Sequence, residues 1–175
     1  MGRPAGRGAR DPRGLRRRTA TLLALGLAGA AAGGAWLATA LMGGPWGMVP
    51  GGRLRGPATP CNGIRWEAFA EAREVEVEVR PERPRSVTTW SVVHGGALYL
   101  PADFLTPWKR WPHQVEADER IRLRVGDGIF ECRAERVRDE AVIEALRAAA
   151  AAKYELAPDG RAARAQVWWF RVAPR

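Results

Sequence analysis

Residues 120–135 read RIRLRVGDGIFECRAE, and the alternation in this stretch decides the fold. In its first half, apolar residues alternate with three arginines. After a Gly-Asp-Gly turn, apolar residues alternate with Glu131, Arg133 and Glu135. Strict alternation is typical of strands with one buried and one wet face, so the stretch predicts a β-hairpin. We expect the arginines of its first strand to pair with the glutamates of its second strand.

The flanking segments predict further strands and one main helix. Residues 74–80, EVEVEVR, alternate in the same way, and Asp139 is well placed to cap a helix that runs to about Tyr154. Additional strands are expected over Ser86–Val93, Ala97–Leu100 and Val167–Val172, with a turn at His94–Gly96 and a short helix over Asn62–Arg73. This order predicts an α+β fold, a small and mostly antiparallel split β-barrel with one main helix.

The positive charge of the chain is concentrated at its amino terminus. The formal net charge is +9, and residues 1–18 hold seven arginines and one aspartate, which leaves +3 (9 − 6) for the rest. A body so nearly balanced argues against nucleic acid as a partner, because phosphate binding needs clustered positive charge on the fold itself.

No charged residue occurs between Thr19 and Gly52. Residues 19–42 are long enough for a transmembrane helix, which needs about 20 apolar residues. Two alternatives stay open: a signal peptide cleaved near Ala38–Ala40, and a buried helix of a soluble protein. Because the arginines precede the stretch, the positive-inside rule makes residues 1–18 a basic cytoplasmic tail. The sequence therefore predicts a single-pass protein of the cell membrane with an exported carboxy-terminal domain.

The Gly- and Pro-rich residues 43–60 are expected to form a linker, and residues 61–175 the split-barrel domain. Cys61 and Cys132 are the two cysteines. In an exported domain they are able to form a disulfide, and the alternative is a small buried thiol at Cys132.

The sequence lacks the motifs of common catalytic sites. GxSxG, GxxxxGK[ST], GxGxxG and HExxH are all absent, and the two histidines, His94 and His113, have no carboxylates at metal-ligand spacing. We therefore predict no metal site and assign no catalytic residue.

Residues 105–113, LTPWKRWPH, combine aromatic and basic side chains. Pro112 suits the first turn of a short helix, whose start exposes N–H groups that favour anions. A phosphate cradle would be built from Lys109, Arg110 and His113, with Trp108 or Trp111 packed on a planar ring. In the alternative, both tryptophans plug one end of the barrel and the cations are solvated.

Three segments in succession resemble a known family: LYLP at 98–101, ADERIRLRVGDGIFECRAERVRD at 117–139 and AAKY at 151–154. The succession resembles the split β-barrel flavin-binding superfamily, which includes pyridoxamine-phosphate-oxidase-like proteins and deazaflavin-dependent nitro- and quinone reductases. The similarity covers about Glu74 to Val172. Residues 117–121 look like the family's entry into a strand, with Glu119 where proline is usual.

The resemblance implies a homodimer that binds FMN or a deazaflavin. Basic and hydroxyl side chains would hold the phosphate, and the matching positions are Thr106, Lys109 and Arg110, with Thr88, Thr89 and Trp90 beside the ring. Asp103 adds a negative charge in a segment where many members carry a threonine. The implied function is a membrane-anchored flavin- or deazaflavin-dependent oxidoreductase. The alternative is a non-catalytic envelope domain for interaction or assembly, with a degenerate cofactor cleft.

Overall fold

The computed structural model describes residues 26, 29, 33, 34, 43–104, 109–157, 160 and 165–175. The chain divides into two units, Met1–Leu37 and Ala38–Arg175. In the first unit only four helical glycines are described, so the predicted tail at 1–18 and most of the predicted transmembrane helix at 19–42 lie outside the described residues. Among the described residues, no helix has both the length and the apolar character that a membrane crossing requires.

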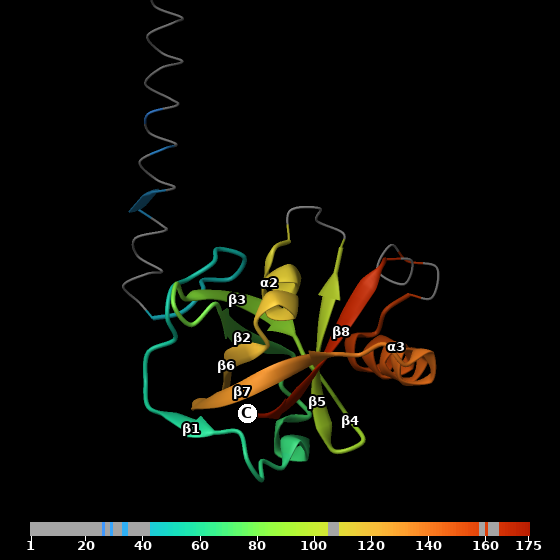
Figure 1. The fold of residues 1–175 in the computed structure, drawn as a ribbon. Coiled ribbons are helices and arrows are strands. Elements are labelled where there is room, and N and C mark those ends of the chain that lie inside the picture. Colours follow the sequence, from blue (N-terminus) through green and yellow to red (C-terminus); the bar gives the residue numbers. More distant parts are fainter. Residues whose placement is uncertain are drawn as a thin grey trace, which may run out of the picture. The chain divides into compact units, whose positions relative to one another are not determined.

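The second unit is built on one eight-stranded sheet (Figure 1). Seven strands follow the order β3-β2-β6-β7-β8-β5-β4, and β1 pairs with β7 outside this path. The only parallel pair among the described strands is β1 with β7. The strands are β1 (Ala58–Pro60), β2 (Glu74–Val79), β3 (Arg85–Trp90), β4 (Val92–His94), β5 (Ala97–Asp103), β6 (Arg120–Val125), β7 (Gly128–Arg136) and β8 (Val167–Pro174).

The sheet curls so that strands far apart in its order approach each other. The Thr89 hydroxyl on β3 donates a hydrogen bond to the Pro101 carbonyl on β5, at 3.1 Å. The alternating apolar residues of the strands fill the interior, where Val77, Ile121 and Leu123 are fully buried. The predicted α+β class and the split-barrel-like arrangement are thus confirmed.

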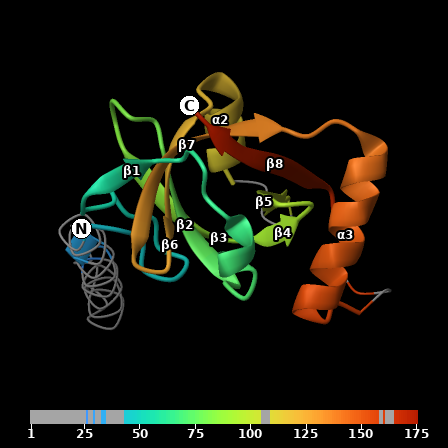
Figure 2. The ribbon, with the colours of Figure 1, turned by 90° about the horizontal axis from the view of Figure 1, so that it is seen from below.

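Two α-helices flank the barrel. Helix α2 (Trp111–Ala117) buries Trp111 and Val115 in the barrel core. Helix α3 (Glu140–Tyr154) lies on the side opposite β1 and packs on β4, β5 and β8 (Figure 2). Its predicted cap is present, because the Asp139 carboxylate accepts hydrogen bonds from the N–H groups of Ala141 and Val142.

Three elements differ from the expectations. A short 3-10 helix, η1 (Trp66–Phe69), stands where a longer helix was predicted. The predicted strand over Ser86–Val93 is interrupted at Ser91, whose N–H donates to the Arg73 carbonyl and to the Tyr154 hydroxyl. Strand β1 lies in the predicted linker, and its three residues carry no alternating pattern that would have revealed it.

The pairing of the arginines also differs from the expectation. In the register of the sheet, Arg122 and Arg124 on β6 lie opposite Glu78 and Glu76 on β2, and they form ion pairs with those residues. Arg122 also lies opposite Glu131 of β7, as expected, but among the described ion pairs Glu131 is joined to Arg175 instead. Alternation alone does not say which of two neighbouring strands supplies the opposite charge.

A disulfide joins Cys61 to Cys132, and both residues are buried. It ties the segment that follows β1 to the middle of β7, across 71 residues of sequence. Of the two possibilities that the sequence left open, the structure has the disulfide.

Candidate functional site

A pocket of about 760 Å³ lies on one side of the barrel. It opens between β3, β5, β8 and α3, and this volume is within the range that holds a drug-sized ligand. Most of its wall is apolar. The side chains that line it include Met48, Thr88, Thr89, Trp90, Pro101, Asp103, Lys109, Ala148, Ala151, Leu156, Val167 and Trp169.

Four of the residues predicted to contact a cofactor meet in this pocket: Thr88, Thr89, Trp90 and Lys109. Trp111 does not line it, because its indole is buried in the barrel core against Phe170. Arg110 is exposed at the start of α2, and the His113 ring packs beside Phe104 and Trp168. Thr106 and Trp108 lie outside the described residues.

The lysine of the pocket forms an ion pair. Lys109 Nζ lies 2.7 Å from the Asp103 carboxylate, and the Lys109 side chain is only 20% exposed. Glu74, Glu144 and Arg147 also line the pocket. The described wall therefore holds three acids and two bases, and these residues give the hollow no excess of positive charge.

The side chain of Trp90, which forms the aromatic wall of the pocket, is held in place by Tyr154. The Trp90 ring stacks on Tyr154, with ring centres 4.4 Å apart and planes inclined by 13°. The Tyr154 hydroxyl donates to the Arg73 carbonyl and accepts from the Ser91 N–H. Burial raises the pKa of Tyr154, so this hydroxyl stays protonated over a wide range of pH.

The sequence did not reveal the helical wall of the pocket. Ala148, Ala150 and Ala151 of α3 line it, together with Leu156 just beyond the helix. The alanine run was interpreted only as a feature that lengthens the helix. Its second effect is spatial, because methyl side chains leave a hollow where larger residues would fill the space against the sheet.

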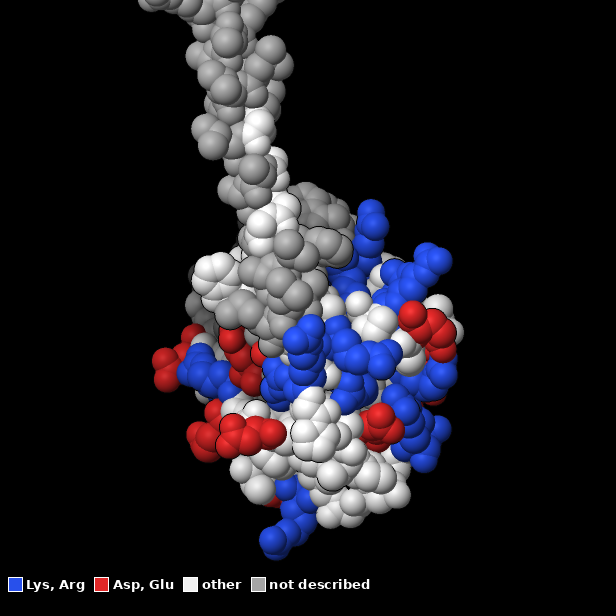
Figure 3. Space-filling model, turned by 90° about the vertical axis from the view of Figure 1, so that its left-hand side faces the viewer, with Lys and Arg blue, Asp and Glu red and all other residues white. Residues whose placement is uncertain are grey.

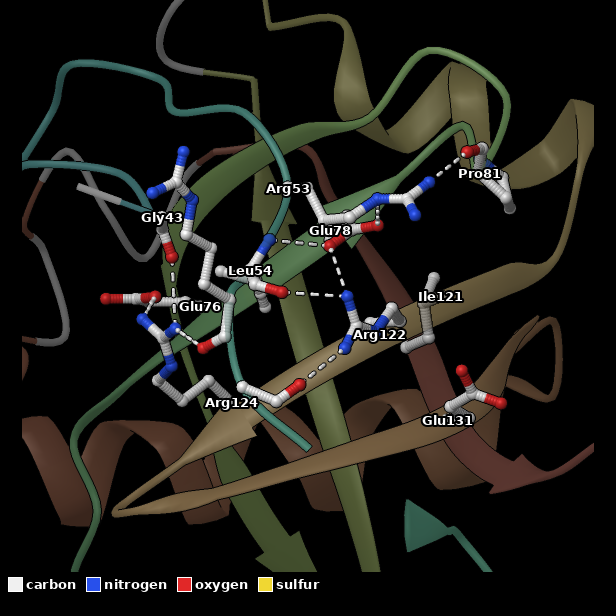
Figure 4. Close-up of polar contacts among 12 residues, drawn as sticks. Gly43, Arg53, Leu54, Glu76, Glu78, Pro81, Ile121, Arg122, Arg124 and Glu131 are labelled. Carbon is white, nitrogen blue, oxygen red and sulfur yellow. Dashed lines mark hydrogen bonds and ion pairs between the residues drawn. The ribbon is translucent and has the colours of Figure 1, made fainter. Parts of the chain in front are cut away.

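Residues 43–56, which we call the strap, are hydrogen-bonded to the barrel (Figure 4). Arg124 donates to the carbonyls of Gly43 and Arg55, and Arg122 donates to the Leu54 carbonyl at 2.7 Å. Gly51 exchanges two backbone hydrogen bonds with Ser86 of β3. A side chain on Gly51 would collide with the backbone of Gly44, so glycine here permits close packing.

Beside the strap lies a smaller, polar pocket of about 280 Å³ lined by Arg53, Glu78, Arg122 and Arg175. Figure 3 shows Lys and Arg side chains gathered on this side of the molecule, with Asp and Glu among them. The guanidinium groups of Arg53, Arg122 and Arg175 each donate to backbone carbonyls. These arginines therefore mainly join distant segments of the chain through hydrogen bonds.

No protein-family model matches the chain, and no curated protein matches it either. Among solved structures, a conserved hypothetical protein from Mycobacterium tuberculosis matches with a TM-score of 0.51 and 16% identity, over 69% of this chain and 84% of that one. A FAD-binding protein from Mesorhizobium loti matches with a TM-score of 0.46 and 13% identity, over 67% and 92% of the two chains. An F420 reductase matches with a TM-score of 0.43 and 18% identity, over 62% and 92%.

Identities this low concern the fold and do not carry an activity from one protein to another. The first of these matches supports what the strand order and the curled sheet already indicate. The chain from β1 to β8 has an α+β, mostly antiparallel fold of the split-barrel type.

Proposed function

We propose that the protein is a membrane-anchored oxidoreductase whose pocket binds a flavin or a deazaflavin. The observation that carries the proposal is the meeting of Thr89, Trp90 and Lys109, which are predicted cofactor contacts, in one large apolar hollow. In such an enzyme the cofactor supplies hydride or electron transfer, and the protein supplies binding, orientation and electrostatics.

The ring system of such a cofactor suits the pocket. The hollow of about 760 Å³ has walls of alanine, valine and tryptophan, which favour a flat, largely apolar body. Trp90 is 41% exposed and lines the pocket, and its stacking on Tyr154 fixes its orientation. An aromatic wall that is already fixed loses little conformational entropy when a ring packs against it.

The phosphate of such a cofactor does not suit the described residues as they stand. Lys109 is bound to Asp103, and Glu74 and Glu144 add further negative charge to the wall. An anion would have to replace the Asp103 carboxylate at Lys109, at the cost of leaving that carboxylate without this cation. The ion pair is therefore a barrier to phosphate binding, and removing Asp103 should lower it.

The test is a titration of the purified full chain with FMN and with a deazaflavin, followed by absorption and fluorescence. Lys109→Ala should weaken binding by about 1 to 3 kcal/mol, since it removes a charge-assisted hydrogen bond to the phosphate. Asp103→Asn should strengthen binding, because it releases Lys109. Arg110→Ala is the matched control: this arginine is exposed and does not line the pocket, so its loss should change little. Equal affinities for the wild type, Lys109→Ala and Asp103→Asn would refute the assignment of Lys109.

The Lys109–Asp103 ion pair also favours a second candidate function. A cleft whose lysine is neutralised is what the degenerate, non-catalytic envelope domain would contain. If neither cofactor binds at concentrations of tens of micromolar, the proposed oxidoreductase function is abandoned in favour of the interaction or assembly function.

We also propose the cell membrane as the location, with residues 19–42 as the anchor and the barrel exported. The uncharged stretch and the seven arginines before it support this arrangement. The Cys61–Cys132 disulfide supports it further, because disulfides persist outside the reducing cytoplasm.

A further inference from the structure

Three large hydrophobic side chains are exposed among the described residues: Trp46, Met48 and Trp90. Met48 is 96% exposed and Trp90 is 41% exposed, and both line the large pocket, so they stand at its rim. Trp46 belongs to the same tight turn as Met48, because Trp46 and Val49 exchange two backbone hydrogen bonds. We call these three side chains the apolar rim.

The strap fixes the apolar rim to the barrel. The carbonyl of Gly43 accepts hydrogen bonds from the Arg55 N–H and from the Arg124 guanidinium. Gly51 is hydrogen-bonded to Ser86 of β3, and Leu54 is fully buried. The turn that carries Trp46 and Met48 is thus fastened at both of its ends.

The strap begins directly after residues 19–42, the predicted membrane segment. The stretch 19–42 ends one residue before Gly43, and Trp46 follows Met42 by four residues. Four residues of extended chain span at most about 14 Å. If residues 19–42 lie in a bilayer, Trp46 is therefore held near the interface, which is where tryptophan is enriched in membrane proteins.

We propose that the apolar rim docks against the surface of the lipid bilayer, so that the mouth of the pocket lies at the membrane–water interface. The inference rests on the membrane anchor of the proposed function and is independent of any cofactor. Lipid would cover apolar side chains that the chain otherwise leaves in water. A pocket placed in this way is within reach of molecules dissolved in the membrane.

The test uses the full chain reconstituted into vesicles of phosphatidylcholine and phosphatidylglycerol. Met48→Cys is labelled with an environment-sensitive fluorophore, and quenching by a lipid that carries a nitroxide on its acyl chain is measured. The native cysteines are joined in the disulfide, so the introduced thiol alone is free for labelling. The matched control is His94→Cys at the exposed end of β4, beside the β4–β5 turn, which lies away from the strap (Figure 1).

We expect the chain to float with the vesicles and the label at position 48, but not the label at position 94, to lose fluorescence to the nitroxide. A chain that floats with equal quenching at both positions overturns the docking and leaves the anchor standing. A chain that does not float overturns the anchor and the docking together. If the emission wavelength of the label at position 48 shifts with protein concentration and the label is not quenched, a second copy of the chain covers the apolar rim. That result also overturns the proposal.

Discussion

Glu78 is a buried carboxylate, only 2% exposed, and it faces the strap. It accepts a hydrogen bond from the Leu54 N–H at 2.7 Å and forms an ion pair with Arg122 at 3.4 Å. A buried charge is costly unless it is paired and hydrogen-bonded, and these two contacts offset that cost. Because one partner lies on the strap and the other on β6, Glu78 sets the position of the strap on the sheet.

Tyr154 links α3 to two backbone segments, and its removal should depend on pH. Tyr154→Phe should lower the free energy of unfolding near neutral pH by about 1 to 3 kcal/mol, since the Ser91 N–H and the Arg73 carbonyl each lose a partner. The folded state raises the pKa of Tyr154 above its ordinary value of 10.0. The hydroxyl therefore stabilises the folded state fully below about pH 10, and this stabilisation is lost as the pH rises through the raised pKa of Tyr154.

Urea unfolding of the wild type and Tyr154→Phe between about pH 7 and pH 11 checks this prediction, and the difference in stability should narrow at the alkaline end. Burial lowers the pKa of the neighbouring Lys153, which makes stability rise with pH, but this effect is common to both proteins and cancels in their difference. A constant difference between the wild type and Tyr154→Phe would contradict the role assigned to ionisation.

At the residue scale, the sequence predicted part of the candidate site. Thr89 and Trp90 were assigned from the family resemblance, and Lys109 was assigned from the basic segment 105–113 as well; all three lie in one pocket. Trp111 lies in the same aromatic and basic segment as Trp108 and was predicted to contact the cofactor, yet its side chain is in the core and only 4% exposed. Which tryptophan faces a hollow depends on the orientation of α2, and local sequence does not fix that orientation.

At the scale of the elements, regular patterns were predicted well and irregular ones were not. The alternation over 120–135 gave β6 and most of β7, and the cap at Asp139 gave the start of α3. The strap and β1 were not predicted, because their Gly and Pro residues indicate a linker. Their order comes from distant partners, such as Arg124 for Gly43 and β7 for β1, which no local pattern encodes.

The disulfide between the segment after β1 and strand β7 should contribute strongly to stability. It closes a loop with a sequence separation of 71 residues, and the loss of loop entropy in the unfolded chain corresponds to roughly 4 kcal/mol. We expect a reductant to lower the midpoint of urea unfolding of the wild type accordingly.

The double variant Cys61→Ala with Cys132→Ala provides the control for the disulfide. Its midpoint should already be low and should not respond to the reductant. An unchanged midpoint for the reduced wild type would show that strand pairing alone holds this side of the barrel.

At the scale of the whole molecule, the proposed anchor and the disulfide lead to one prediction about topology. With tags at both ends of the chain, protease added to intact spheroplasts should remove the carboxy-terminal tag and leave the amino-terminal tag, because the proposed topology puts the barrel outside and the arginine-rich tail inside. A detergent-permeabilised sample, in which both tags are cleaved, serves as the control. A carboxy-terminal tag that stays protected in intact spheroplasts would refute the exported barrel.

The Cys61–Cys132 bond also limits how mechanical force can act on the protein. A pull on the chain from the amino-terminal side first loads the hydrogen bonds of the strap at Gly43 and Leu54. Once these, the Gly51–Ser86 hydrogen bonds and the pairing of β1 with β7 yield, the 18 residues (61 − 43) up to Cys61 can span at most about 65 Å. The load then passes through the sulfur atoms to β7 and bypasses residues 62–131, so the strands in that loop are shielded from tension applied at the amino-terminal side.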